Sequence, residues 1–481
     1  MDATKPCSSM SDAKIQRMTA ADPQRLHAGL DSTLEMERIF SDRQRVQSML
    51  DVEAALAVAE ARHDVIPLAA ATAIAASCDA GVIDFPALAQ HAAAAGNLAI
   101  PLVKQLTARV AQNDAEAAKY VHWGATSQDI IDTGMVLQLR AALGDIDAHL
   151  MQLGDVLAQL AERHRNTPQV GRTWMQHALP VTFGLKVAGW LDAVQRHKIR
   201  IAQLKIDVAV VQFGGAAGTL ASLGKNGLKV AQGLADELTL TVPATPWHST
   251  RDRFAEVATT LGMLTGSLGK MALDIALLAQ TEIAELAEPL ATSGSGGSAR
   301  GGSSSMPHKR NPVSCAATLA AARRVPGLVA TMLSAMAQEN ERALGGWQAE
   351  WECLPQIVKL CACALQNMLT VCANLHVDSE RMRANLDLTQ GQIMAEAVTL
   401  ALGAKIGRQA AHEVIERACR IANADGRHLR SVLEQDGVIG ANLSTNELDQ
   451  AFDANQYNGV TFQFIARVVE SWRALTHVER Q

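Results

Sequence analysis

Hydrophobic residues recur at alternating intervals of three and four along three stretches of the chain. The longest covers residues 254–278, and the others cover residues 146–160 and 354–372. This alternation places apolar side chains on one face of a helix and repeats every seven residues, as in helices that pack side by side. We therefore predict a bundle of long helices whose apolar stripes form a common core.

The two other local patterns concern the N-terminus and the strands. Residues 1–30 are polar and aperiodic, so we expect the ordered protein to begin near Phe40, with a helix starting at Ser41. The only strand-like run, residues 239–247, contains two prolines, which disfavour a central strand. The pattern predicts an all-α protein. We expect a loose tail (1–30), an N-terminal helical domain (31–119), a central long-helix bundle domain (120–372) and a C-terminal helical domain (373–481).

The composition agrees with this prediction and excludes several functions. Hydrophobic residues make up 48% of the 481 residues but aromatic residues only 4%, so the apolar mass is mostly helix-forming Ala, Leu and Met with Val and Ile. A net charge of −6 without a long Lys or Arg block argues against nucleic acid. The eight cysteines include no CxxC pair, which predicts reduced thiols in a cytoplasmic protein. The first residues contain no apolar export segment, and we expect no membrane span.

One glycine- and serine-rich segment, residues 292–305, cannot be packed core. Its composition alone favours a flexible linker. The following MPHKRNP, however, places Lys309 and Asn311 directly before a helix-favouring run. Asn311 fits an N-cap and Pro312 a first helical position. Because a helix N-terminus carries partial positive charge, the sequence predicts an anion site beneath a mobile loop.

A second predicted loop-to-helix junction lies at residues 122–134. Thr126 and Asp129 have the spacing of a capping box, and His122 and Ser127 lie beside them. Plain capping explains the pattern as well as a ligand site does, so both interpretations stay open here.

A third junction, residues 171–180, ends at Pro180, which fits the first turn of a helix. Ahead of this proline the chain carries Arg172, Trp174, Gln176 and His177. None of these residues is decisive alone, and most of the 14 histidines are expected to be structural.

Taken together, the three junctions indicate a site for carboxylates. GSGGSA at residues 294–299 lacks a preceding strand, so it is no dinucleotide motif, and the sequence has neither a Walker pattern nor metal-ligand spacing. Lysine, arginine, hydroxyls and helix N-termini suit a reaction that removes a proton next to a carboxylate, because they stabilise the enediolate-like transition state. A mobile loop would exclude water.

At this point the sequence resembles a known superfamily. GSSSMPHKRNP, residues 302–312, is similar to the GSSxMPxKxNP stretch of fumarase, aspartase, adenylosuccinate lyase and argininosuccinate lyase. GATSQDIIDT and GRTWMQH match two other regions of that superfamily in the same order, and the resemblance covers nearly the whole chain from about residue 33. It implies an all-α, three-domain fold and a homotetramer whose active sites are shared between three subunits. It implies no metal and no cofactor.

The resemblance also implies roles for individual residues. Ser303 would be the general base, while Lys309 and Asn311 would hold a substrate carboxylate and stabilise the intermediate. Thr126 and Ser127 would bind another carboxylate, and His177 and His248 are candidates for the acid or for orientation. The remaining expected substrate contacts are His122, Arg172, Trp174, Gln176, Ser304 and Met306.

Departures from the superfamily pattern point to a subgroup. Adenylosuccinate lyases usually carry histidine at the positions of Trp174 and near Asn97, whereas GRTWMQHALP and PWHSTRDR resemble bacterial 3-carboxymuconate cycloisomerases. This resemblance implies interconversion of 3-carboxy-cis,cis-muconate and 4-carboxymuconolactone in protocatechuate breakdown by the β-ketoadipate pathway. Two alternatives stay open: a lyase that eliminates ammonia, nitrite or an amine from a substituted succinate, and a non-catalytic protein like the crystallins related to argininosuccinate lyase.

Overall fold

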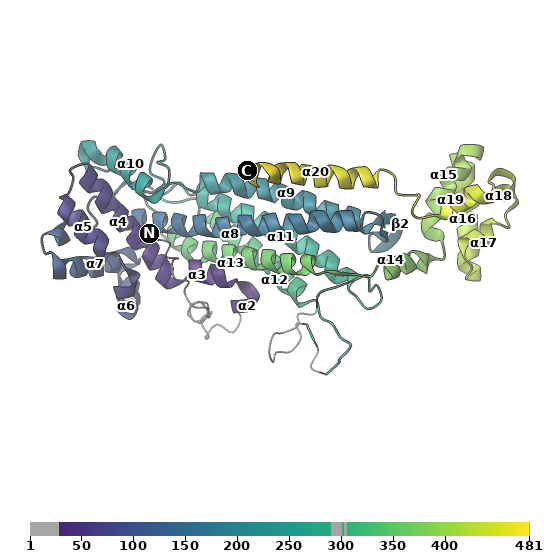
Figure 1. Cartoon of the computed structure of the whole chain (residues 1–481), viewed down its shortest axis with the longest axis horizontal. Helices are drawn as coiled ribbons and strands as arrows, with labels where there is room; N and C mark the ends of the chain where they lie inside the picture. The colour runs from purple at the N-terminus through teal and green to yellow at the C-terminus, as the bar shows by residue number, and fades with distance from the viewer. Residues whose placement is uncertain (1–27, 290–300, 303–304, 481) are drawn as a thin grey trace, which may run out of the picture. The chain divides into compact units, whose positions relative to one another are not determined.

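The computed structural model describes residues 28–289, 301–302 and 305–480, and this part is mainly helical (Figure 1). Its contacts divide the chain into two compact units. The first unit consists of three segments: the described residues up to His149, residues 198–266 and residues 320–366. The second unit contains residues 150–197, 267–319 and the chain from 367 onward.

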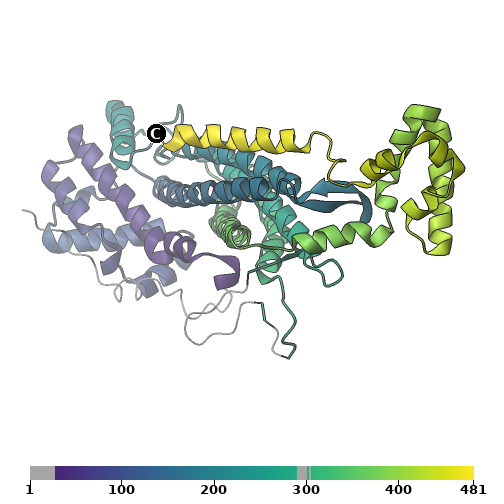
Figure 2. The same cartoon turned by 45° about the vertical axis from the view of Figure 1, so that its right-hand side comes forward.

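Six long helices carry nearly half of the buried apolar residues. In each unit the segments of these helices that belong to it run side by side (Figures 1 and 2). Every position of the three predicted apolar stripes is at most 6% exposed, which confirms the predicted bundle and the all-α class. The long helices are α8 Ser127–Arg163, α9 Phe183–Asp207, α11 Asp252–Leu278, α12 Val313–Ser334, α13 Gly346–Ala373 and α20 Thr461–Arg480.

Two of these helices, α11 and α13, are long and apolar enough to cross a membrane by length and composition. Their most apolar windows are 50% and 67% buried inside the protein. Burial of one stripe against neighbouring helices is typical of core helices in a soluble protein.

The first unit also contains a group of shorter helices, most of which precede α8 in the sequence. Ser41 caps α4 by accepting a hydrogen bond from the backbone N–H of Gln44, which confirms the predicted helix start. The expectation that order begins near Phe40 is wrong, because α2 and α3 precede it and Met36 of α3 is fully buried. These helices are α2 Ala28–Asp31, α3 Leu34–Ile39, α4 Asp42–Arg62, α5 Leu68–Ser77, α6 Phe85–Ala95, α7 Ala99–Asn113 and α10 Gly227–Leu238, with short 3-10 helices at Ala80–Val82, Ala117–Tyr120 and Gly224–Asn226.

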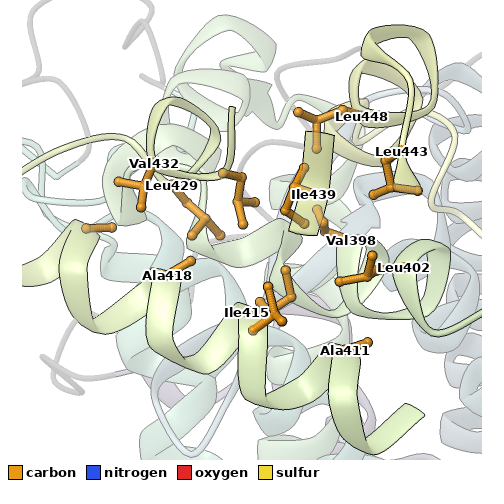
Figure 3. Close-up of a cluster of buried hydrophobic side chains, with 13 residues drawn as sticks. Val398, Leu402, Ala411, Ile415, Ala418, Leu429, Val432, Ile439, Leu443 and Leu448 are labelled. Atoms are coloured by element: carbon orange, nitrogen blue, oxygen red, sulfur yellow. The ribbon is translucent and has the colours of Figure 1, made fainter. Parts of the chain in front are cut away.

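The C-terminal helices of the second unit form a small core of their own. Figure 3 shows its aliphatic side chains, including Val398, Ile415 and Leu429, which interlock between short helices. The helices are α14 Ser379–Leu386, α15 Ala395–Ile406, α16 Arg408–Asp425, α17 Leu429–Leu433, α18 Gly437–Asn442 and α19 Thr445–Phe452, with 3-10 helices at Asp387–Thr389 and Gln392–Met394. The chain then returns as α20, whose Trp472 fits against α8 because Gly154 there has no side chain; a Cβ would lie 2.1 Å from the indole.

A β-hairpin in the second unit corrects the sequence analysis. Strands β1 Pro168–Thr173 and β2 Gln176–Thr182 pair antiparallel, and Pro180 lies opposite Val170. Pro180 is therefore a strand residue, and the following helix begins only at Phe183. The predicted strand-like run at 239–247 contributes only one bridge, between Thr241 and Val210. A second two-stranded pair joins β3 Leu286–Ala287 to β4 His376–Val377.

Candidate functional site

In the first unit, one buried carboxylate organises the start of α8. Oδ1 of Asp129 accepts hydrogen bonds from Nε2 of His248 at 2.8 Å and from the backbone N–H of Gly214 at 3.1 Å. Oδ2 accepts from the backbone N–H groups of Thr126 at 3.0 Å and Gly215 at 2.9 Å. A carboxylate with so many donors fixes several loops at once. Asp129 thus places the predicted residues Thr126 and His248 around one buried group.

The predicted capping box at this helix is only half formed. The Asp129 carboxylate accepts from the backbone of Thr126, but the backbone N–H of Asp129 donates to the carbonyl of Thr126 and not to its hydroxyl. The Thr126 hydroxyl instead accepts a hydrogen bond from Nη2 of Arg342 at 2.8 Å. The hydroxyl is therefore held by a cation and not used as a cap.

Arg342 is a residue that the sequence analysis missed. It lies in the irregular segment between α12 and α13, and its Nη2 also donates to the carbonyl of Ala216 at 2.8 Å. Its Nε is buried without a hydrogen-bond partner among the described residues. An arginine beside a threonine at a helix N-terminus fits an anion site. No periodic pattern in the sequence marks Arg342, because its contact with Thr126 forms only when a loop distant in sequence folds back beside α8.

A buried group of three charged side chains, centred on Arg251, lies in the same unit. Arg251 is 2% exposed and forms ion pairs with Asp132 of α8 at 2.6 Å and with Glu350 of α13 at 2.5 Å. Its guanidinium also lies over the rings of Trp247 and Phe254, each centroid 4.9 Å away. The triad ties α8 and α13 to the residue that precedes α11, three positions after His248.

His122 lies just ahead of α8 and contacts an acidic side chain of α4. Its Nδ1 lies 2.6 Å from Oε1 of Glu53, which is 1% exposed. Burial opposes a charged imidazole, but the contact with the Glu53 carboxylate and the charge of Asp129 together raise the pKa of His122 above its ordinary value. Ser127, the other candidate here, is the first residue of α8 and is half-buried.

In the second unit, Arg172 of β1 is paired with a buried carboxylate. Its Nη2 donates to Oε1 of Glu285 at 2.6 Å and its Nη1 to Oε2 at 3.3 Å. Glu285 also accepts from Gln169 and Asn385, each at 2.8 Å. Glu285 therefore orients Arg172 and offsets its charge, a partnership that the sequence did not reveal.

His177 lies opposite Arg172 in the hairpin. Burial lowers the pKa of His177 below its ordinary value, and the positive charge of Arg172 lowers it further. Its Nδ1 is buried and has no hydrogen-bond partner in the part of the chain that the structure describes. The ring also borders a cavity of about 400 Å³ that Gln390 and Asn423 help to line. A neutral imidazole of this kind can accept or relay a proton.

The tip of the hairpin is formed by two left-handed residues. Trp174 has φ 51° and Met175 has φ 65°, as in the tight turns of two-residue hairpins. Trp174 is 98% exposed and Met175 is 73% exposed, and the next residue, Gln176, is exposed as well. Neither Trp174 nor Gln176 therefore faces a closed pocket formed by the described residues.

The start of α12 corrects the prediction for Asn311. The helix begins at Val313, and the carboxylate of Glu288 accepts the backbone N–H groups of Ser314 at 3.1 Å and Cys315 at 2.7 Å. Asn311 is therefore not the N-cap, and the protein's own Glu288 fills the positive end of this helix. Glu288 follows β3, so its side chain connects the two ends of the loop.

The described ends of the loop are also joined through the backbone. Gly302 and Arg310 form an antiparallel bridge, and the N–H of Asn311 donates to the carbonyl of Gly301 at 2.8 Å. Met306 and Lys309 lie between Gly302 and Arg310, and both are exposed. Ser303 and Ser304 lie outside the described residues.

Thus His122, Thr126, Ser127 and His248 belong to the first unit, and Arg172, Trp174, Gln176, His177, Met306, Lys309 and Asn311 belong to the second. Among the described residues, no group of three or more His, Cys, Asp or Glu side chains is arranged to hold a metal ion. The described cysteines are all free thiols.

Comparison with known proteins identifies the family. Residues 31–327 match the lyase family, and residues 391–468 match the adenylosuccinate lyase C-terminus. The chain is 52% identical to the 3-carboxy-cis,cis-muconate cycloisomerase of Pseudomonas aeruginosa, over 92% of this chain and 95% of that protein. The crystal structure of a 3-carboxy-cis,cis-muconate lactonizing enzyme from Pseudomonas putida superposes with a TM-score of 0.89 at 49% identity, over 94% of this chain and 99% of that one.

A nitrosuccinate lyase from Streptomyces davaonensis is more distant, at 39% identity over 90% of this chain and 92% of its own length. Sequence and fold thus agree over nearly the whole chain with enzymes of one kind. The chain belongs to the 3-carboxy-cis,cis-muconate cycloisomerase family within the fumarase/aspartase superfamily of lyases.

Proposed function

We propose that this protein interconverts 3-carboxy-cis,cis-muconate and 4-carboxymuconolactone. The observation that carries the proposal is the 52% identity to a cycloisomerase over 92% of the chain. The match leaves no large part of either protein unaccounted for. Polycarboxylate chemistry also agrees with the cationic and hydroxyl groups around α8.

The reaction is an isomerisation, so no atom is gained or lost overall. In the closing direction a substrate carboxylate oxygen forms a C–O bond to one alkene carbon, and the electron pair of the double bond moves to the neighbouring carbon. That carbon lies next to another carboxylate, which takes up the charge as an enediolate-like group. A proton then completes the lactone, and the opening direction reverses these steps.

Within this proposal Ser303 is the group that exchanges the proton, as a base in the opening direction and as an acid in the closing one. Lys309 and Asn311 stabilise the enediolate-like charge. Thr126 and Ser127 bind a second carboxylate, and the hydrogen bond from Arg342 to Thr126 supports this assignment by adding a cation there. The neutral His177 and the carboxylate-held His248 are the candidates for proton relay or orientation.

The same proposal includes the assembly and the setting. We expect a homotetramer with active sites shared between three subunits, a cytoplasmic location and a three-domain division of the chain. The exposed tip at Trp174 and Met175 supports subunit contact, because large apolar side chains on a monomer surface commonly mark interfaces.

Incubation of the purified protein with 3-carboxy-cis,cis-muconate, followed by loss of its ultraviolet absorbance, tests the function. We expect turnover by the wild type. Ser303→Ala should lose nearly all activity while its size on a gel-filtration column stays unchanged. Absence of turnover by folded wild-type protein would overturn the function, and full activity of the variant would overturn the role of Ser303.

A lyase that acts on a substituted succinate is the second candidate, favoured by the 39% identity to nitrosuccinate lyase. It would use the same carbon-acid chemistry but release nitrite, ammonia or an amine. A panel of substituted succinates, assayed by fumarate formation, separates the two candidates. Fumarate release at a rate above that of lactone formation would favour the lyase.

A further inference from the structure

Two buried glutamates on α4 have no assigned role, and one of them, Glu53, contacts His122 beside the predicted substrate-binding junction. Glu53 and Glu60 are each 1% exposed and stand seven residues apart, so two helical turns place them on the same face. Oε2 of Glu53 and Oε1 of Glu60 have no hydrogen-bond partner among the described residues. Two adjacent carboxyls in this environment cannot both be charged at low cost.

The two carboxyls differ in what they contact. Glu53 has His122 at 2.6 Å, whereas burial and the charge of Glu53 raise the pKa of Glu60 to about 9. Glu60 is therefore neutral at neutral pH. Burial opposes a charged His122 imidazole, but the contact with Glu53 and the charge of Asp129 together raise the pKa of His122.

The backbone of His122 supplies an independent observation. Its φ is 61°, a left-handed conformation that is costly for a residue with a side chain. Such strain persists only where the surroundings impose it, and it gathers at functional sites. The contact with Glu53 uses Nδ1, so Nε2 is the nitrogen left to face a ligand. His122 lies five residues before Ser127, the first residue of α8. The negative charge of Asp129 on α8 also raises the pKa of His122.

We propose that Glu53 is a positioning residue that holds the His122 ring through Nδ1, with Nε2 directed to a substrate carboxylate at the start of α8. This inference rests on the proposed function for the nature of the substrate. Glu53 does not touch the substrate; it fixes the orientation of the ring. The carboxylates that act on His122 are Glu53 from α4 and Asp129 from α8, and the buried Cys78 thiol and Glu60 adjoin Glu53.

Glu53→Gln and Glu60→Gln make a matched pair of variants. Both substitutions keep the side-chain shape on the same face of α4. The first removes the negative charge beside His122, while the second replaces a carboxyl that is already neutral. Glu53→Asp restores the charge with a shorter reach.

The first measurement is an NMR titration of histidine-labelled protein, with the His122 signals assigned from a His122→Asn variant. We expect Glu53→Gln to lower the pKa of His122 by at least one unit, and Glu60→Gln to leave it within a few tenths of the wild-type value. An unchanged His122 titration in Glu53→Gln would overturn the proposal. This readout does not depend on turnover, so it remains valid if the proposed function fails.

The second measurement is the binding of tricarballylate, an unreactive tricarboxylate, by calorimetry at pH 6 and pH 8. Wild type and Glu60→Gln should bind with similar affinity, while Glu53→Gln should bind about tenfold more weakly at pH 8, with partial recovery in Glu53→Asp. In turnover assays the same loss should appear mainly in KM. Equal binding by wild type and Glu53→Gln would show that His122 does not serve the substrate.

Discussion

Nε2 of His248 lies 2.8 Å from Oδ1 of Asp129, and both side chains are buried. A carboxylate that accepts one ring nitrogen leaves the other as the nitrogen that can exchange a proton. The same carboxylate holds the backbone of Gly214, Gly215 and Thr126. The position of the imidazole is therefore set together with the start of α8.

Replacing Asp129 by Asn should destabilise the protein strongly. The amide would place a donor against N–H groups that now face a charged acceptor, so we expect a loss of about 2–4 kcal/mol in unfolding free energy. Urea denaturation measures it. Asp192→Asn serves as the control, because Asp192 pairs with Arg196 at the surface and should cost below about 1 kcal/mol. A loss at Asp129 no larger than at Asp192 would contradict the role of this carboxylate.

Breaking the buried triad of Arg251, Asp132 and Glu350 should destabilise the protein. Glu350→Ala leaves Arg251 with one carboxylate in a site that is nearly closed to water, and should cost about 3–5 kcal/mol. Glu416→Ala, which removes the exposed partner of Arg420, should cost below about 1 kcal/mol. Similar melting temperatures of the two variants would mean that the triad adds nothing to the bundle.

Glu288 should affect turnover more than stability. Glu288→Gln weakens the carboxylate that joins the two ends of the loop at the start of α12, with an expected loss of about 1 kcal/mol in unfolding free energy. Because Lys309 and Asn311 follow the same loop, we expect kcat to fall at least tenfold. Glu447→Gln likewise weakens a carboxylate contact to a backbone N–H at the start of α19 and should leave kcat unchanged. Equal kcat values in the two variants would contradict the link between Glu288 and the site.

The raised pKa of the buried Glu60 carboxyl should make the free energy of unfolding depend on pH. Its pKa is raised from 4.5 to about 9, so between these values the folded state holds a proton that the unfolded state releases. Stability therefore falls as pH rises through this window, by at most ~1.4 kcal/mol per unit from this group, and is flat below it. Glu60→Gln should remove that slope. Urea midpoints between pH 5 and pH 9 test this, and parallel slopes in both proteins would show that Glu60 ionises normally.

The helices and the class of fold could be predicted from sequence because their signals are local. The apolar stripe of residues 254–278 repeats along a single helix. Ser41 caps α4 through a hydrogen bond from the backbone N–H of Gln44, only three residues away. The hairpin escaped prediction because GRTWMQH lacks strand alternation, and Pro180 reads as a helix start although it occupies a strand.

The partners within the candidate site could not be predicted for a different reason. Asn311 and Pro312 have the residue types of a helix start, yet Glu288 caps the helix from the other end of the loop. Arg342 reaches Thr126 across 216 positions of sequence, and no spacing rule connects them. The segment TEIAELAEP ahead of the loop, rich in glutamate, was the available signal for Glu285 and Glu288.

Turnover of 3-carboxy-cis,cis-muconate in D₂O tests the proposed reaction, because lactone formation by this route requires a solvent-derived proton at the carbon next to a carboxylate. We predict that NMR of the product will show 4-carboxymuconolactone with one deuterium at that carbon. Lactone without deuterium would contradict the proposed proton transfer, and unchanged substrate in the presence of folded enzyme would contradict the assigned reaction.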